Sequence, residues 1–90
     1  MSRHVVLVED EPAIRQNYAD ALLKQGYHVT TCDSKDKALK AFGQRMPDLA
    51  IIDISLGEDV EGGFDLCRIL RNKSSTLPII FLTARDSDFD

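Results

Sequence analysis

Short apolar runs alternate with longer segments of helical periodicity along the whole chain. Four runs predict strands, at His4–Val8, His28–Cys32, Leu49–Ile52 and Leu77–Leu82. The segments between them predict three helices: Pro12–Gln25, a helix capped by Asp33 or Ser34, and Phe64–Arg71. This βαβαβαβ order predicts an α/β fold with a doubly wound parallel sheet, because parallel strands need crossover helices, which cover both faces.

The strands differ in how completely apolar they are, which indicates their places in the sheet. The first, third and fourth are continuously apolar, as strands buried on both faces are, whereas His28–Cys32 is mixed and fits an edge. Arg85–Asp90 is typical of a cap and the first turn of a further helix. We therefore expect residues 1–90 to be one partial domain of about four strands and three helices. Leu77–Leu82 would then form an apolar edge that can pair with another chain.

Helical spacing also predicts which side of two helices is buried. In the first helix the predicted buried side is formed by Ile14, Tyr18 and Leu22. In the third helix it is formed by Phe64, Cys67 and Leu70.

Composition narrows the class of protein. The chain has 90 residues, 43% hydrophobic content and 11 basic against 15 acidic side chains, a net charge of −4. We therefore expect a folded chain of one domain at most, and its acidic balance argues against direct nucleic-acid binding. No apolar run approaches the roughly 20 residues that span a bilayer, and the acidic stretch Glu9–Glu11 is unlike a secretory signal. We therefore expect no membrane partner. Cys32 and Cys67 lack metal-ligand spacing, so we expect two free thiols in a cytoplasmic protein.

Polar residues follow three of the predicted strands, at the edge where parallel sheets form their sites. Glu9 and Asp10 follow the first strand, Asp53 follows the third, and the fourth is followed by Thr83 and Ala84. In a flavodoxin-like strand order these strands are neighbours, so the side chains converge. Clustered carboxylates repel one another, and Mg²⁺ suits a site with few hard oxygen ligands. A carboxylate beside Mg²⁺ can act as a nucleophile and form an aspartyl phosphate, to which Thr83 would donate a hydrogen bond.

The acidic residues do not all carry the same weight. Those at 58–61 lie in a stretch with several glycines and are interpreted as solvated surface. Asp53 directly ends an apolar run and is flanked by isoleucines, where an acid is costly unless it has a purpose. His4 and His28 have no acid or Cys partner at a suggestive spacing, so both are assigned to structure.

Three stretches of the chain resemble the receiver domain of bacterial two-component response regulators. Val5–Pro12 resembles its opening, Leu49–Leu56 its phosphoacceptor strand, and Ile79–Arg85 its fourth strand with the switch threonine. The resemblance covers the whole chain in the right order and implies a flavodoxin-like (CheY-like) fold. It also implies a phosphoryl acceptor rather than an enzyme, with at most self-catalysed phosphotransfer and autodephosphorylation.

The resemblance implies a role for each candidate residue. Asp53 would be the phosphorylated aspartate, and Asp10 would be the direct ligand within an acidic pair that holds Mg²⁺. The full set of metal ligands would be Glu9, Asp10, Asp53 and the backbone carbonyl of Ser55. Thr83 would contact the phosphoryl group, and Ala84 would leave room for it.

Some features depart from the family pattern, and others point to a subgroup. Glu9 stands where Asp is commoner, the loop after Asp53 is longer and lacks a Pro, and we expect the family's fifth strand, phosphate-binding lysine and last two helices to be missing. Leu82–Asp86 is typical of OmpR-type regulators, which carry a winged-helix DNA-binding domain, although no effector domain is expected within residues 1–90. Gly63–Arg68 resembles regulators associated with a dedicated sortase system in proteobacteria. The expected partner is a sensor histidine kinase, for which the candidate docking positions are Ile14, Arg15 and Tyr18.

Other functions are open to the same fold. A receiver without the lysine would be impaired in phosphorylation and act as a protein interaction module, dimerising through Leu77–Leu82. A nucleotide- or flavin-binding domain would need a turn that cradles phosphate after the first strand, where Glu9–Pro12 instead repels it. A phosphatase of the haloacid-dehalogenase type would need an Asp-x-Asp motif, and here Ser55 stands in place of the second acid.

Overall fold

The computed structural model describes residues 3–53 and 62–82. They form seven elements in the predicted alternating order. The strands are β1 (His4–Val8), β2 (His28–Cys32), β3 (Leu49–Asp53) and β4 (Ile79–Leu82). The helices are α1 (Pro12–Lys24), α2 (Lys35–Gln44) and α3 (Gly62–Lys73).

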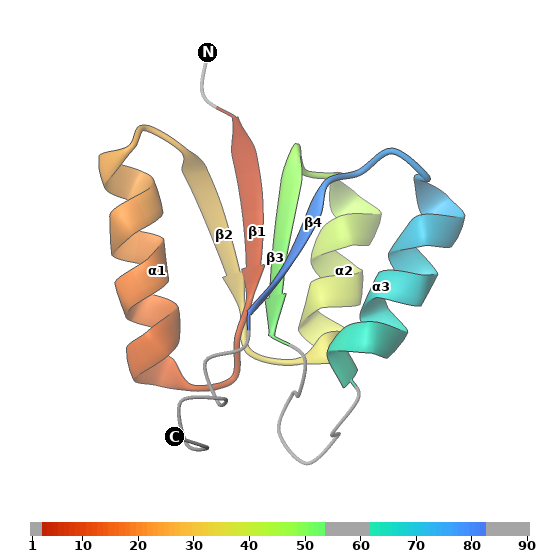
Figure 1. Ribbon diagram of the computed structural model, residues 1–90, viewed down its shortest axis with the longest axis horizontal. Coiled ribbons are helices and arrows are strands. Elements are labelled where there is room, and N and C mark those ends of the chain that lie inside the picture. Colours follow the sequence, from red (N-terminus) through yellow and green to blue (C-terminus); the bar gives the residue numbers. More distant parts are fainter. Residues whose placement is uncertain (1–2, 54–61, 83–90) are drawn as a thin grey trace.

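The four strands form one parallel sheet in the order β2-β1-β3-β4. Helix α1 covers one face of this sheet, and α2 and α3 cover the other (Figure 1). The predicted doubly wound parallel fold and the edge position of β2 are therefore both confirmed. Because all strands run the same way, the carboxyl ends of β1 and β3 lie side by side in the middle of the sheet (Figure 1).

The core lies in two layers, because alternate side chains of a strand point to opposite faces. The layer under α2 and α3 is the larger, and its buried members are Val6, Val8, Cys32, Ala38, Phe42, Ala50, Ile52, Leu66, Leu70 and Leu77. The layer under α1 is built from Val5, Leu7, Ala19, Ile51 and Leu82. All five residues of β1 are buried, which fits a central strand.

Helix α1 is turned differently from the prediction. Pro12 occupies its first turn, where a missing N–H is tolerated, and Gly26 follows its end with a φ of 91°. The buried residue is Ala19, whereas Tyr18 is 39% exposed, so the predicted face is wrong at its centre. The small side chain of Ala19 lets the helix lie close to the sheet, and Leu22, one turn later, packs against the same layer.

The other two helices show one confirmed cap and one corrected face. Ser34 is the N-cap of α2, and its hydroxyl accepts a hydrogen bond from the backbone N–H of Lys37. In α3 the buried side chains include Leu66 and Leu70, while Phe64 is exposed. The predicted buried side of α3 is therefore wrong at Phe64, because the spacing of four residues from Leu66 to Leu70 defines the face that meets the core.

Candidate metal and phosphoryl site

Three carboxylates meet at the carboxyl ends of the two central strands. Glu9 and Asp10 follow β1, and Asp53 is the last residue of β3. Each offers a carboxylate oxygen, and these oxygens all lie within 4.8 Å of one another. The parallel register, with Val8 opposite Ile52, brings the two strand ends to the same height. The predicted convergence of these three residues is therefore present in the structure.

The cluster is largely shielded from solvent. The exposed fractions of Glu9 and Asp53 are 1% and 2%, and Asp10 is half-buried. One oxygen of Glu9, Oε2, accepts a hydrogen bond from the backbone N–H of Glu11 at 3.1 Å. The other, Oε1, is buried and receives no N–H from the part of the chain that is described. Two carboxylates so deeply buried are costly unless a positive charge offsets them.

The pKa of Glu9 reflects this environment. This pKa is raised from 4.5 to about 7, mainly by burial and additionally by the neighbouring carboxylates of Asp53 and Asp10. The hydrogen bond from the N–H of Glu11 acts in the opposite direction but is outweighed by burial. Glu9 therefore holds a proton over much of the neutral range when no cation is bound.

The donor set fits a hard divalent cation. The cluster offers only carboxylate oxygens, which Mg²⁺ prefers over the nitrogen and sulfur ligands of softer metals. The oxygen of Glu9 that lacks an N–H donor could serve a cation directly or through water. Glu9, Asp10 and Asp53 could thus hold Mg²⁺, with water filling the remaining positions.

The β1–α1 turn that carries Glu9 and Asp10 is held from several sides. The backbone N–H of Glu9 donates to the carbonyl of Cys32 at the end of β2, at 3.0 Å. Nη1 of Arg15 in α1 donates to the carbonyl oxygen of Glu9 at 2.9 Å. Sequence reasoning singled out Arg15 only as a position for partner docking. Arg15 follows Glu9 by six residues and lies near the start of the next helix. This spacing is the signal that could have predicted a contact between Arg15 and Glu9.

Several predicted site residues lie outside the described residues. These are Ser55, Thr83 and Ala84, together with the acids at 58–61. Their predicted roles stay predictions.

Neither the cysteines nor the histidines belong to the carboxylate cluster. Cys32 is buried and Cys67 half-buried, and both are free, as predicted. Burial also raises the pKa of the Cys32 thiol. His4 is buried at the opposite end of the sheet, where its Nε2 lies 2.8 Å from the hydroxyl of Thr30. Burial lowers the pKa of His4, with Arg45 and then His28 adding to the effect.

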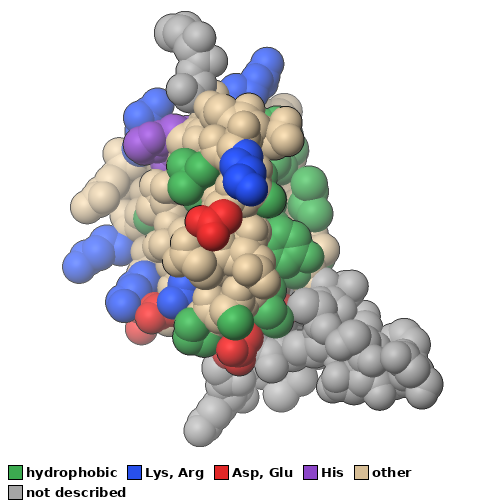
Figure 2. Space-filling view, turned by 90° about the vertical axis from the view of Figure 1, so that its left-hand side faces the viewer, with side chains coloured by type: hydrophobic (Ala, Val, Ile, Leu, Met, Phe, Trp, Pro, Cys, Tyr) green, Lys and Arg blue, Asp and Glu red, His purple; other side chains and the backbone are tan. Residues whose placement is uncertain are grey.

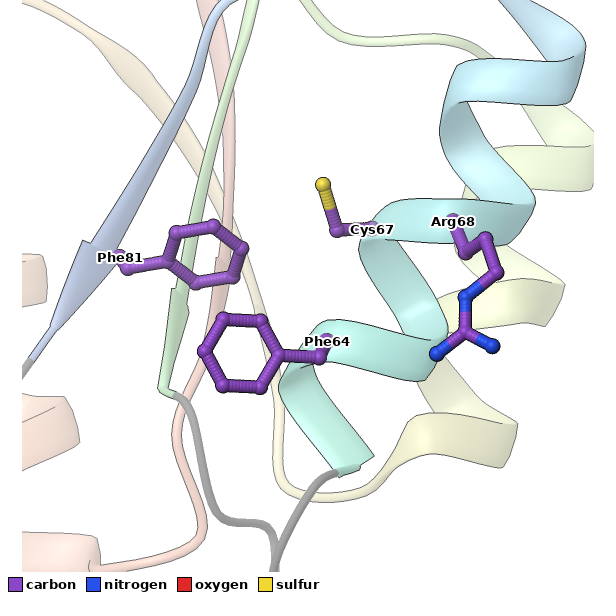
Figure 3. A pocket seen from close by; sticks show the side chains of 4 residues that line it. All are labelled: Phe64, Cys67, Arg68 and Phe81. Carbon is purple, nitrogen blue, oxygen red and sulfur yellow. The ribbon is translucent and has the colours of Figure 1, made fainter.

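A hollow in the described part of the surface has a lining separate from the carboxylates. It has a volume of about 490 Å³ and is lined by Phe64, Cys67 and Arg68 of α3 and by Phe81 of β4 (Figure 3). The rings of Phe64 and Phe81 face each other with centroids 5.2 Å apart and planes tilted by 53°. None of its described lining residues is a carboxylate, so within the described part of the chain it is distinct from the acidic site.

The face that carries α1 has a mixed surface. Acidic, basic and apolar side chains are interspersed there, and those of the described residues form no continuous basic patch of the kind that nucleic acid binds (Figure 2). Among the described residues, no helix combines the length and the apolar character needed to cross a membrane.

Comparison with known proteins gives a consistent result. Residues 5–90 match the family described as the response regulator receiver domain. The chain is 41% identical over 87 residues to the transcriptional regulatory protein AfsQ1 of Streptomyces coelicolor. The matched region covers 96% of this chain and 37% of that relative. It therefore spans little more than a third of the length of the curated relatives it matches.

Solved structures agree in fold. NtrX from Brucella abortus matches with a TM-score of 0.83 and 30% identity, over 90% of this chain and 18% of that one. The non-phosphorylated receiver domain of HemR from Leptospira biflexa matches with a TM-score of 0.81 and 23% identity, over 98% of this chain and 74% of that one.

Proposed function

This chain belongs to the response regulator receiver domain family, and we propose that it accepts a phosphoryl group on Asp53 in a Mg²⁺-dependent reaction. The observation that carries the proposal is the meeting of Glu9, Asp10 and Asp53 at the ends of β1 and β3. Asp53 is 2% exposed, yet it lies at the carboxyl end of a central strand, which is where ligands bind in parallel sheets. A buried nucleophilic carboxylate beside two further acids is the arrangement that phosphoryl transfer through a metal requires.

The chemistry is one displacement at phosphorus. A carboxylate oxygen of Asp53 forms a bond to phosphorus, and the bond from phosphorus to the donor's leaving group breaks with its electron pair. The product is an acyl phosphate on Asp53. When bound, Mg²⁺ neutralises the carboxylates and the charge on the incoming phosphoryl group. Glu9 and Asp10 would hold the metal beside Asp53, and the shielded position of Asp53 would keep most water away from the product.

The physiological donor in this proposal is a sensor histidine kinase, which would transfer the group from a phosphohistidine. We further propose that phosphorylation switches the conformation of the chain through Thr83. We also propose that a longer protein carrying this domain regulates transcription, because the relative AfsQ1 is named a transcriptional regulatory protein. A cytoplasmic location and a similarity to sortase-associated regulators stay predictions.

Intact-mass spectrometry after incubation with acetyl phosphate tests the proposal. We expect one phosphoryl group per chain with Mg²⁺, and none with a chelator or in Asp53→Asn. Asp48→Asn is a matched control, because Asp48 precedes the opposite end of β3, where it accepts a hydrogen bond from the backbone N–H of His4. The asparagine keeps that acceptor, so labelling should be unchanged. Labelling that survives in Asp53→Asn would rule out Asp53 as the acceptor.

A second candidate function is self-association through β4. Strand β4 is at the edge of the described sheet, and its Ile80 is 51% exposed. Phe64, beside the hollow next to β4, is 45% exposed. Apolar side chains at an unpaired edge favour pairing with a second copy.

Sedimentation velocity over a range of concentrations tests this candidate. We expect a concentration-dependent dimer that Ile80→Lys abolishes. The control is Leu23→Lys, because Leu23 is 54% exposed on α1, away from the edge. A chain that stays monomeric at the highest concentration would exclude the dimer, and it would leave the phosphoryl-transfer proposal untouched.

A further inference from the structure

We propose that Arg15 is a positioning residue for the Mg²⁺ site, acting through the backbone of the β1–α1 turn rather than through its charge. The inference rests on the proposed function, since it concerns the same site. Its starting observation is the hydrogen bond of 2.9 Å from Nη1 of Arg15 to the carbonyl oxygen of Glu9.

The peptide group between Glu9 and Asp10 is the link from Arg15 to the metal ligands. A peptide group is planar, so the carbonyl of Glu9 and the N–H of Asp10 turn together. When Arg15 fixes the direction of that carbonyl, it also fixes the direction from which the Asp10 backbone continues. The position of the Asp10 carboxylate therefore depends on the contact between Arg15 and the Glu9 carbonyl.

Arg15 makes a second contact with this turn, where α1 begins without a side-chain cap. Glu11 is the N-cap of α1, but its side chain makes no capping hydrogen bond. The backbone N–H of Arg15 donates to the carbonyl of Glu11 at 2.9 Å, so Arg15 binds the turn through both its main chain and its side chain. The N–H of Glu11 in turn donates to the side chain of Glu9. Arg15 thus closes a set of contacts around the two acids, in the place of an ordinary cap.

Charge and position predict opposite effects on metal binding. A guanidinium is always positively charged, so near a bound dication it repels the metal. If charge were its main effect, removing Arg15 would tighten the binding of Mg²⁺. If position is its main effect, removing Arg15 loosens binding, because the Asp10 ligand is no longer aligned. Groups that orient metal ligands typically contribute a factor of about 10–100 to metal affinity.

A second arginine supplies a matched control. Nη1 of Arg71 in α3 donates to the carbonyl of Leu77, which is also six residues away, in the connection to β4. Arg71→Ala therefore removes the same type of contact, an arginine bonded to a backbone carbonyl, from a part of the chain that holds none of the three acids. It reports the effect of a general loss of stability on the site.

The experiment is a Mg²⁺ titration of the chain at pH 8, followed by the backbone amide signals in ¹H–¹⁵N NMR spectra. We expect Arg15→Ala to weaken Mg²⁺ binding by about 10-fold or more, and Arg71→Ala to bind as the wild type does. In chelator, before any metal is added, the amide signal of Asp10 should shift in Arg15→Ala and stay in place in Arg71→Ala. If Arg15→Ala does not fold, Arg15→Lys is titrated instead. It keeps the charge but not the forked donor geometry, so weaker binding is again expected.

Three outcomes would overturn the inference in different ways. Tighter binding by Arg15→Ala would mean that Arg15 acts by charge. Unchanged binding, or an equal loss in Arg15→Ala and Arg71→Ala, would mean that Arg15 has no specific role at the site. A wild-type chain that binds no Mg²⁺ would overturn the proposed function together with the inference, and this result is distinguishable because it requires no variant.

Discussion

Replacing Glu9 by glutamine should stabilise the metal-free chain at alkaline pH. Glu9 is 1% exposed and lies beside Asp53 and Asp10, and burial first and these neighbours next raise its pKa to about 7. Its carboxyl group therefore binds more protons in the folded than in the unfolded chain between pH 4.5 and about 7. The resulting stability is fully present below pH 4.5 and is lost as the pH rises through 7. Glutamine has nearly the same shape and no charge to lose.

The magnitude follows from the two pKa values. The difference between 4.5 and about 7 is about 2.5 pH units, and each unit corresponds to about 1.4 kcal/mol. The full effect on the free energy of unfolding is thus about 3 kcal/mol, and most of it falls between pH 5 and pH 8. A domain has a total stability of roughly 5–15 kcal/mol, so the effect is large enough to measure.

The assay is urea unfolding of wild type and Glu9→Gln, in chelator, at intervals from pH 5 to pH 8. The quantity of interest is the difference in the free energy of unfolding between the two proteins, because titrating groups remote from Glu9 contribute equally to both. It should move in favour of Glu9→Gln by about 2–3 kcal/mol across this range. Mg²⁺ at pH 8 should narrow the difference, because binding to the folded wild type stabilises it by mass action.

A difference that does not change with pH would refute the reasoning. It would mean that Glu9 is charged in the folded chain at neutral pH, so that burial is not the dominant influence on its pKa. A difference that moves in favour of the wild type as the pH rises would have the same meaning and would imply a cationic partner for Glu9.

Three further predictions concern stability. Phe42→Ala, which removes a side chain that is 2% exposed, should lower the free energy of unfolding by about 3–5 kcal/mol, whereas Leu23→Ala on the surface should change it by less than about 0.5 kcal/mol in the same urea titration. Ser34→Ala should cost about 1 kcal/mol by loss of the α2 cap, and no change in urea midpoint would show that the cap is dispensable. In a Glu9→Gln background, stability should fall as the pH drops below 6.5, because burial lowers the pKa of His4. His4→Gln should flatten this dependence, and a slope that persists in that variant would assign it to another group.

The fold was predictable because the relevant signals are local. The apolar runs of β1 and β3 and the mixed polarity of β2 predict both the strands and their places in the sheet. The convergence of Asp10 and Asp53 followed from one general property of parallel sheets, that neighbouring strands end at the same edge. No side-chain detail was needed for that step.

Helix rotation was harder to predict from spacing alone. Ile14, Tyr18 and Leu22 fit helical spacing well, but Ala19 is the residue that meets the sheet. A small side chain is a weak signal in a periodicity pattern, although it permits the closest approach of the helix. In α3, the hydrophobic side chain of Phe64 predicts a core position. It instead packs against Phe81 beside an open hollow at the surface.

The pKa of Glu9 and the contact made by Arg15 were also beyond sequence reasoning. The pKa depends on a burial of 99% and on the approach of carboxylate oxygens to within 4.8 Å, both of which require tertiary structure. The Arg15 contact depends on how the first turn of α1 is rotated relative to β1. A sequence indicates that a long basic side chain lies nearby, but not which carbonyl it reaches.

Locating the phosphoryl group on the chain tests the central claim most directly. The chain is treated with acetyl phosphate and Mg²⁺, reduced with borohydride, which converts an aspartyl phosphate to homoserine, and then digested and sequenced by mass spectrometry. We predict homoserine at position 53 alone, and only in samples that contained Mg²⁺. Homoserine at Asp10 or Asp48, or its formation without any metal, would contradict the assignment of Asp53 as a metal-assisted phosphoryl acceptor.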